Sequence, residues 1–177
     1  MGILPGPSRA RGWTWPSCEH RRVEPERLTK ADFDEIVERL DAFWGERDLS
    51  ALHHPMFIHE FGDSALVIRD EHGGVAAYLL GLIVPQRRLG YVHLVAVRQD
   101  RRGQGLGRRL YERFRELARE RGCHTLKAIT TPGNAVSVAF HSALGMDALE
   151  AGDYAGIGRP RVVFTAALED DRQGTRR

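Results

Sequence analysis

The junction between residues 91 and 121 constrains the fold of this chain most strongly. The apolar run YVHLVAV (91–97) has the β-branched composition of a strand, and the loop RQDRRGQGLGRRL (98–110) follows it at once. From residue 106 to 121 apolar side chains recur at helical spacing, and Gly122 ends the pattern. We therefore predict a strand that runs through a glycine-rich loop directly into an amphipathic helix, an arrangement of α/β domains.

The loop places glycines at every second position, Gly103, Gly105 and Gly107, and four arginines crowd around them, Arg101, Arg102, Arg108 and Arg109. A helix N-terminus leaves backbone N–H groups without partners and carries a partial positive charge, and glycine lets these groups approach an anion. Arginine adds forked donors that suit phosphate. We interpret the loop as a phosphate or pyrophosphate site, rather than a glycine turn with solvated arginines, because three glycines weaken the start of a helix.

Two common phosphate-binding patterns do not match this loop. A P-loop ends in Gly-Lys-Ser/Thr, whereas this loop ends in Gly107-Arg108-Arg109. A dinucleotide fingerprint requires G-x-G-x-x-G, whereas the spacing here is G-x-G-x-G. The next predicted strand, HTLKAIT (124–130), also lacks the acidic residue that would bind a ribose.

The remaining periodicity predicts the order β, α, (α), β, β, β, α, β, α, β, β. Thr29 and Asp32 resemble a capping box at the start of a helix that ends at Gly45, and Trp44 falls on its apolar face. Residues 48–60 are ambiguous, with a short helix that Pro55 interrupts. The other predicted elements are a hairpin of 64–70 and 75–84, strands at 90–97, 124–130 and 161–168, and helices at 106–121 and 134–144.

Length and composition indicate one globular domain at 21–168, with a loose arm at 1–20 and a frayed tail at 169–177. No apolar run approaches the ~20 residues that span a bilayer, and Pro5 and Pro7 break any signal-peptide core, so we expect a cytoplasmic protein without a membrane partner. The 26 basic residues are nearly balanced by 24 acidic ones, which argues against nucleic acid. The two cysteines form neither a disulfide framework nor a zinc site.

A family resemblance is carried by two stretches. Residues 102–107, RGQGLG, match R/Q-x-x-G-x-G/A, the pyrophosphate loop of the GNAT N-acetyltransferase superfamily. Residues 134–146, NAVSVAFHSALGM, resemble the second signature of that family, N-x-x-A/S-x-x-(apolar)-Y-x-x-L-G-F. The resemblance is firm over 74–150 and extends in layout from about 22 to 168.

This resemblance implies an α/β GNAT fold, with a mixed, mostly antiparallel sheet of six to seven strands flanked by about four helices. It implies that acetyl-CoA is the co-substrate and that the acetyl group passes to a primary amine of a small molecule or peptide by direct attack in a ternary complex. We expect no metal, and a homodimer is one assembly to test. The cofactor-binding residues that it implies are Val95, Ala96 and Val97 for the pantetheine arm, Arg102, Gly103, Gln104, Gly105, Leu106, Gly107 and Arg108 for the pyrophosphate, and Asn134 for the arm.

The resemblance also frames the catalytic candidates. The signature tyrosine, which often protonates the CoA thiolate, is replaced by His141, which either donates this proton or packs as a polar residue beside the cofactor. Tyr154 in the loop GDYAGIGRP is a rival acid, against the alternative of a surface loop tyrosine. His93 is the leading candidate base, against a structural role in the sheet; alternation makes it face away from Val92 and Leu94, and Tyr91, on the same face, is weaker. The family would stabilise the oxyanion with a backbone N–H near Val97.

A histidine-rich segment, HHPMFIHE (53–60), lacks the spacing of a zinc motif. We interpret it first as an exposed segment and second as part of the acceptor pocket. Because His141 departs from the signature, a module that binds acyl-CoA without turnover, as a sensor or scaffold, is the alternative function.

Overall fold

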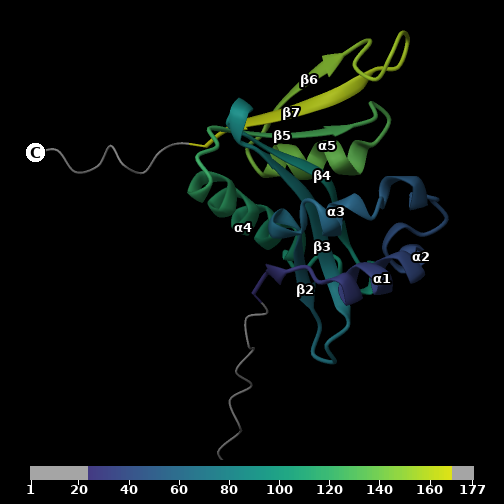
Figure 1. Ribbon diagram of the computed structural model, residues 1–177. Helices are drawn as coiled ribbons and strands as arrows, with labels where there is room; N and C mark the ends of the chain where they lie inside the picture. Colours follow the sequence, from purple (N-terminus) through teal and green to yellow (C-terminus); the bar gives the residue numbers. More distant parts are fainter. Residues whose placement is uncertain (1–23, 169–177) are drawn as a thin grey trace, which may run out of the picture.

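The computed structural model describes residues 24–168, which form a three-layer α/β domain with a twisted sheet between two groups of helices (Figure 1). The predicted arm at 1–20 and the predicted tail at 169–177 lie outside the described residues.

The sheet has seven strands in the order β1-β2-β3-β4-β5-β7-β6. Neighbouring strands are antiparallel except β4 and β5, which are parallel. The strands are β1 (Glu26–Arg27), β2 (Leu66–Arg69), β3 (Val75–Val84), β4 (Leu89–Val97), β5 (Thr125–Thr130), β6 (Asp147–Ala151) and β7 (Arg161–Ala167). This mixed sheet confirms the predicted fold class, and each strand with a predicted range is present, with ends that lie within two residues of that range.

The helices divide between the two faces of the sheet. Helix α4 (Leu106–Glu120) and helix α5 (Ala135–Ala143) enclose one apolar core, which contains Phe114 and Phe164. Helices α1 (Lys30–Glu38), α2 (Leu40–Trp44) and α3 (Met56–His59) enclose the other, which contains Phe43 and Phe57. Four 3-10 turns complete the described elements, at Ser50–Leu52 (η1), Gly62–Ser64 (η2), Pro85–Arg87 (η3) and Gln99–Arg101 (η4).

The first predicted helix is two helices. The capping box is present, since Thr29 accepts from the N–H of Asp32 and the Asp32 carboxylate accepts from the N–H of Thr29. Arg39, however, takes φ −123° and ψ 33°, which ends α1 before α2 begins. Val37, near the end of α1, is 41% exposed. Gly45, at φ 63°, ends α2 as predicted.

A β-bulge in β4 sets the orientation of the side chains at its centre. Leu80 of β3 pairs with Leu94 and Gly81 pairs with Val92, so His93 has no partner across the ladder. Consequently Val92 packs in the core under α4 while Leu94 packs in the core of the opposite face. The prediction from simple alternation was therefore half wrong, because His93 faces away from Val92 but shares its face with Leu94.

Helix α4 approaches the sheet closely at Gly81, the β3 residue next to the bulge. A Cβ built on Gly81 would lie 2.3 Å from the ring of Phe114, so only glycine fits at this position. Phe114 of α4 therefore packs directly on β3 beside the bulge.

Beyond the bulge, β4 and β5 separate. Their pairing ends at Val92 and Ala128, whereas β5 continues to pair with β7 as far as Thr130. The N–H of Arg98 donates to Ala76 of β3 over 2.9 Å. Since backbone groups alternate along a strand, Val95 and Val97 direct their N–H and C=O groups to the opposite side, toward the strand that has diverged.

Candidate active site

The loop between β4 and α4 presents a continuous row of unpaired backbone donors. Gly103 and Gly105 take φ of 78° and 76°, and Gly105 is the N-cap of α4 without any side-chain cap. The first N–H to return to an acceptor is that of Arg109, which donates to the carbonyl of Gly105. Among residues 24–168, the six N–H groups from Gly103 to Arg108 donate to no protein acceptor. This geometry is that of an anion site at a helix N-terminus.

The arginines near the loop fall into two groups. Arg98 pairs with Asp70 and Asp100, and Arg101 pairs with Glu71, so carboxylates balance their charge. Arg102 instead donates to the carbonyl of Phe43 over 2.7 Å, and Arg108 donates to the carbonyl of Ala143 over 2.7 Å. Neither Arg102 nor Arg108 forms an ion pair within residues 24–168, so both leave positive charge beside the row of N–H groups.

The third glycine and Asn134 serve the packing of α5. A Cβ on Gly107 would lie 3.2 Å from the ring of Phe140, so this glycine allows α4 and α5 to approach each other. Asn134 caps α5 by accepting from the N–H of Ser137, and its amide donates to Thr130 at the end of β5. The amide of Asn134 keeps one N–H and one lone pair for a further partner.

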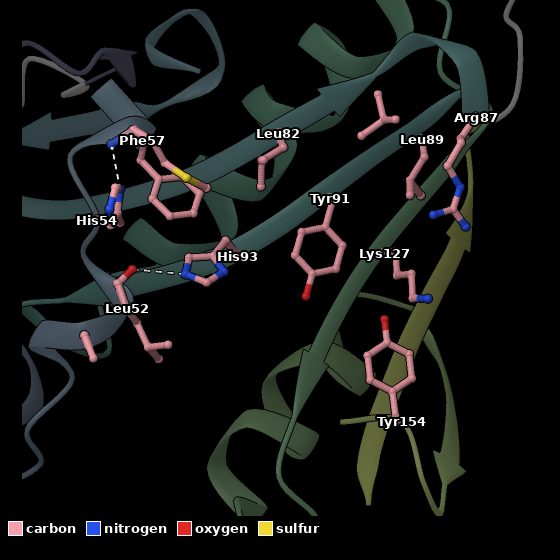
Figure 2. A pocket seen from close by; sticks show the side chains of 13 residues that line it. Leu52, His54, Phe57, Leu82, Arg87, Leu89, Tyr91, His93, Lys127 and Tyr154 are labelled. Atoms are coloured by element: carbon pink, nitrogen blue, oxygen red, sulfur yellow. Dashed lines mark hydrogen bonds between the residues drawn. The ribbon is translucent and has the colours of Figure 1, made fainter. Parts of the chain in front are cut away.

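A pocket of about 520 Å³ lies on the face of the sheet opposite α4 (Figure 2). Its walls come from the segment 51–57, the ends of β3 and β4, β5 and the loop before β7. The lining residues are Ala51, Leu52, His54, Met56, Phe57, Leu82, Val84, Arg87, Leu89, Tyr91, His93, Lys127 and Tyr154. Apolar side chains predominate, and these residues include no carboxylate.

His93 is held in one protonation pattern at this pocket. Its Nε2 lies 3.0 Å from the carbonyl of Leu52, which can only accept, so Nε2 carries a proton. The ring stacks on Phe57, with 4.4 Å between centroids. Burial lowers the pKa of His93 below its ordinary value, which favours the neutral ring. Its Nδ1 is then an unprotonated acceptor on the side of the ring that faces Tyr91 (Figure 2).

Two tyrosines and Lys127 occupy the other part of the pocket. Tyr91 pairs with Lys127 across β4 and β5, and the Lys127 Nζ lies 4.9 Å from the ring centroid of Tyr154. Burial, with a contribution from Tyr154, raises the pKa of Tyr91 to about 12. Tyr91 therefore keeps its proton near neutral pH and is a poor base, which leaves His93 as the stronger of the two candidates.

The model of the "Acetyltransferase (GNAT) family" matches residues 24–146, about two thirds of the chain. The match spans the strand, the glycine loop and the helix that carry the row of N–H groups. This chain belongs to the GNAT acetyltransferase family.

Curated relatives of the chain include the L-methionine sulfoximine/L-methionine sulfone acetyltransferases of Pseudomonas aeruginosa strain PAO1 and Pseudomonas paraeruginosa strain PA7. Each is 44% identical over 55 residues, which is 31% of this chain and 32% of the relative. The chain therefore matches about a third of the length of these relatives.

Solved GNAT structures resemble the fold over most of the chain. The ribosomal-protein-alanine N-acetyltransferase of Brucella melitensis is 27% identical with a TM-score of 0.57, and the match covers 81% of this chain and 98% of that one. The acetyltransferase yncA of Salmonella typhimurium, solved with its cofactor acetyl-CoA, is 22% identical with a TM-score of 0.63, over 82% of this chain and 94% of that one.

His141, at the position of the GNAT signature tyrosine, points into the core under α5. It is 4% exposed, its Nδ1 donates to the carbonyl of Ser137, and its Nε2 lies 2.6 Å from the hydroxyl of Tyr111. Its ring stacks on Phe164 at 4.2 Å, and burial lowers its pKa. Both ring nitrogens are engaged, so these contacts favour the packing interpretation of His141 over that of a proton donor.

The histidines of the histidine-rich segment lie in different environments. His54 lines the pocket, whereas His53 is buried, contrary to the first interpretation of an exposed segment. The His53 Nδ1–H donates to the carbonyl of Leu49, and the Nε2 lies 2.7 Å from the hydroxyl of Tyr78. That hydroxyl also accepts from the indole N–H of Trp44, which fits the prediction that Trp44 belongs to the core.

The sequence did not predict the positions of Tyr78, which bonds to His53, and of Lys127, which lines the pocket. Tyr78 reads as one apolar residue in a strand, and nothing local shows that it joins His53 to Trp44. Lys127 had a usable signal, since a charged side chain interrupts the apolar strand HTLKAIT. Within residues 24–168, no group of three or more metal-binding side chains is found, and no helix is long and apolar enough to cross a membrane.

Proposed function

We propose that this GNAT chain transfers an acetyl group from acetyl-CoA to the primary amine of a small molecule or peptide. The observation that carries the proposal is the row of six unpaired N–H groups from Gly103 to Arg108, which lies beyond the same strand, β4, that brings His93 to the pocket. An anion site and an acceptor pocket at one strand are what a ternary complex requires.

The residues that would hold acetyl-CoA fit the group. The row of N–H groups suits the pyrophosphate, and Arg102 and Arg108 add uncompensated charge beside it. Val95 and Val97 direct backbone groups to the diverged edge of β4, where an amide-bearing pantetheine arm can pair. Asn134 has one donor and one acceptor left for that arm. When bound, acetyl-CoA supplies an activated acetyl thioester.

His93 serves in this proposal as the general base. The neutral acceptor amine forms a bond to the acetyl carbon as the carbon–sulfur bond breaks, one proton leaves the nitrogen, and the CoA thiolate takes up a proton. The His93 Nδ1 can accept this proton because Leu52 fixes the other proton on Nε2 and burial keeps the ring neutral. Among the predicted proton donors for the departing thiolate, Tyr154 reaches the pocket, whereas His141 is buried.

A small-molecule acceptor gains support from the Pseudomonas relatives, whose names give L-methionine sulfoximine and L-methionine sulfone as substrates. The match covers a third of those proteins, so we treat these two compounds as first members of an acceptor panel. The pocket, at about 520 Å³ and with a largely apolar lining, is consistent with a compact acceptor.

Release of free thiol from acetyl-CoA, measured over a panel of amines that includes L-methionine sulfone, tests the proposal. Turnover that depends on one class of amine is the expected result. Tight binding of acetyl-CoA with no turnover on any amine would instead favour the sensor or scaffold function. The cytoplasmic location and the homodimer stay predictions. Cell fractionation tests the location, and light scattering tests the homodimer.

A further inference from the structure

The cationic end of the pocket has no counter-charge of its own. Lys127 and Arg87 both line the pocket, and the lining residues include no aspartate or glutamate. Within residues 24–168 neither side chain forms an ion pair, although the other lysine of the chain, Lys30, pairs with Asp34 over 2.6 Å. Lys127 is half-buried in the middle of the sheet, where an unpaired cation costs free energy unless an anion joins it.

Within the described residues 24–168, the Lys127 ammonium contacts the Tyr154 ring, and this contact does not satisfy it. The face of the Tyr154 ring, at 4.9 Å, attracts the cation but offers no acceptor for its three N–H donors. Arg87 adds five donors from an exposed position in η3 at the same end of the pocket (Figure 2). The two side chains therefore form a site for an anionic group that residues 24–168 do not provide.

We propose that Lys127 and Arg87 bind a carboxylate of the acceptor, so that the acceptor is an aminocarboxylate with an apolar body. This inference rests on the proposed acetyl transfer and specifies the substrate class of the same pocket. His93 lies at the end of the pocket opposite Lys127 and Arg87, and Tyr91 lies between the two ends (Figure 2). The Leu82, Val84 and Leu89 side chains supply the apolar wall along the way.

The spacing of the two ends follows from strand geometry. Tyr91 and Lys127 are partners on adjacent strands, and His93 is two residues further along β4. The Cα atoms of His93 and Lys127 are thus separated by roughly 8 Å, from a strand spacing of about 4.8 Å and a rise of about 3.3 Å per residue. The flexible lysine side chain can shorten or lengthen the reach, so both α- and ω-aminocarboxylates belong in the test.

Charge also decides which amines the pocket disfavours. An alkylamine enters as an ammonium near neutral pH and meets two cations with no carboxylate among the lining residues. A diamine or polyamine brings at least one more positive charge into the pocket and is therefore repelled more strongly. An aminocarboxylate, in contrast, pairs its anion with Lys127 and Arg87, which lets the amine lose its proton beside His93 without a net gain of positive charge in the pocket.

The test compares matched amines on the intact protein. Thiol release is measured with L-leucine against L-leucinamide, in which a carboxamide replaces the carboxylate, and with 6-aminohexanoate against hexylamine, in which a methyl group replaces it, at equal concentrations of neutral amine. We expect kcat/KM to be at least about tenfold higher for the aminocarboxylate in one pair or both. Turnover of the amines with no preference for a carboxylate in either pair overturns this inference and leaves the proposed acetyl transfer intact. No turnover on any amine overturns the proposed function itself.

Two variants of equal charge change separate a local effect from a global one. K127M should raise KM for the preferred aminocarboxylate at least about tenfold, whereas kcat/KM for the partner without a carboxylate should not fall, because its ammonium then meets one cation fewer. K30M, which removes a positive charge on α1, should leave both values unchanged, and K127R should restore part of the preference. An undiminished carboxylate preference in K127M contradicts the inference, and so does an equal loss in K30M. If K127M fails to fold, the matched amines on the unaltered protein still decide.

Discussion

At the scale of the residue, the Nδ1 atom of His93 carries the proposed chemistry. We expect H93Q to lower kcat by at least about a hundredfold, because glutamine can still donate to the Leu52 carbonyl but cannot accept the amine proton as a base. Since burial lowers the pKa of His93, the rate should rise with pH through a value below about 6.5 and then level off. The acid limb of this profile should vanish in H93Q.

The profile of kcat against pH, taken with one acceptor, checks this prediction. H72Q, in the exposed turn between β2 and β3, serves as the control and should retain both the rate and the acid limb. An H93Q variant with the rate and limb of the unaltered protein would exclude His93 as the base.

Residues differ in how far the sequence could place them. Gly103 and Gly105 were predictable because a positive φ and a free helix N-terminus depend on a few adjacent residues. The face of His93 depends on pairing with β3, and simple alternation cannot include the bulge between Leu80 and Gly81. For His141, a motif marks the position in the chain, but its burial results from Phe164 and Tyr111, which come from other elements.

At the scale of the element, the N-terminus of α4 is a pyrophosphate site in our proposal. G105E should place a carboxylate beside the six N–H groups and abolish the gain in melting temperature that acetyl-CoA produces. In the unaltered protein we expect that gain to be roughly 5–10 °C when the ligand is at a hundredfold excess over its Kd. Thermal melting with and without ligand measures both.

A matched variant controls for backbone strain. Gly73 has φ 86° and open space around its Cβ position, as Gly105 does at φ 76°, but it lies in the turn between β2 and β3. G73E therefore introduces the same side chain in the same kind of backbone conformation away from the loop. Loss of the ligand-induced gain in both variants, or in neither, would refute the assignment of the loop.

Elements were predicted best where their signals are local. The capping box at Thr29 and the glycine after α4 depend on neighbours in the sequence, and the helices begin and end close to them. The break at Arg39 has no such signal, because it lies inside a continuous apolar period. The divergence of β4 from β5 has no local signal either, because it can be predicted only when the neighbouring strands are known.

At the scale of the whole molecule, the two apolar cores give three histidines a shared role in stability. His53 and His93 lie on the face of α1–α3, and His141 lies on the face of α4 and α5. Burial lowers the pKa of each one. The order of strands and helices predicted the layers that enclose them, but the depth of His53 and His141 emerges only when both faces are packed.

The pH dependence of unfolding follows from these three side chains. A histidine whose pKa is lowered by folding binds fewer protons in the folded state than in the unfolded state just below pH 6.5. Stability should therefore be at its full value above about pH 6.5 and fall as the pH drops below it.

H141Q removes one such site, so the slope of unfolding free energy against pH should decrease by at most about 1.4 kcal/mol per pH unit. Urea unfolding at several values between pH 5 and 7.5 gives the slope. A slope in H141Q equal to that of the unaltered protein would mean that His141 titrates alike in the folded and unfolded states, which its stacking on Phe164 and its bond to Tyr111 argue against.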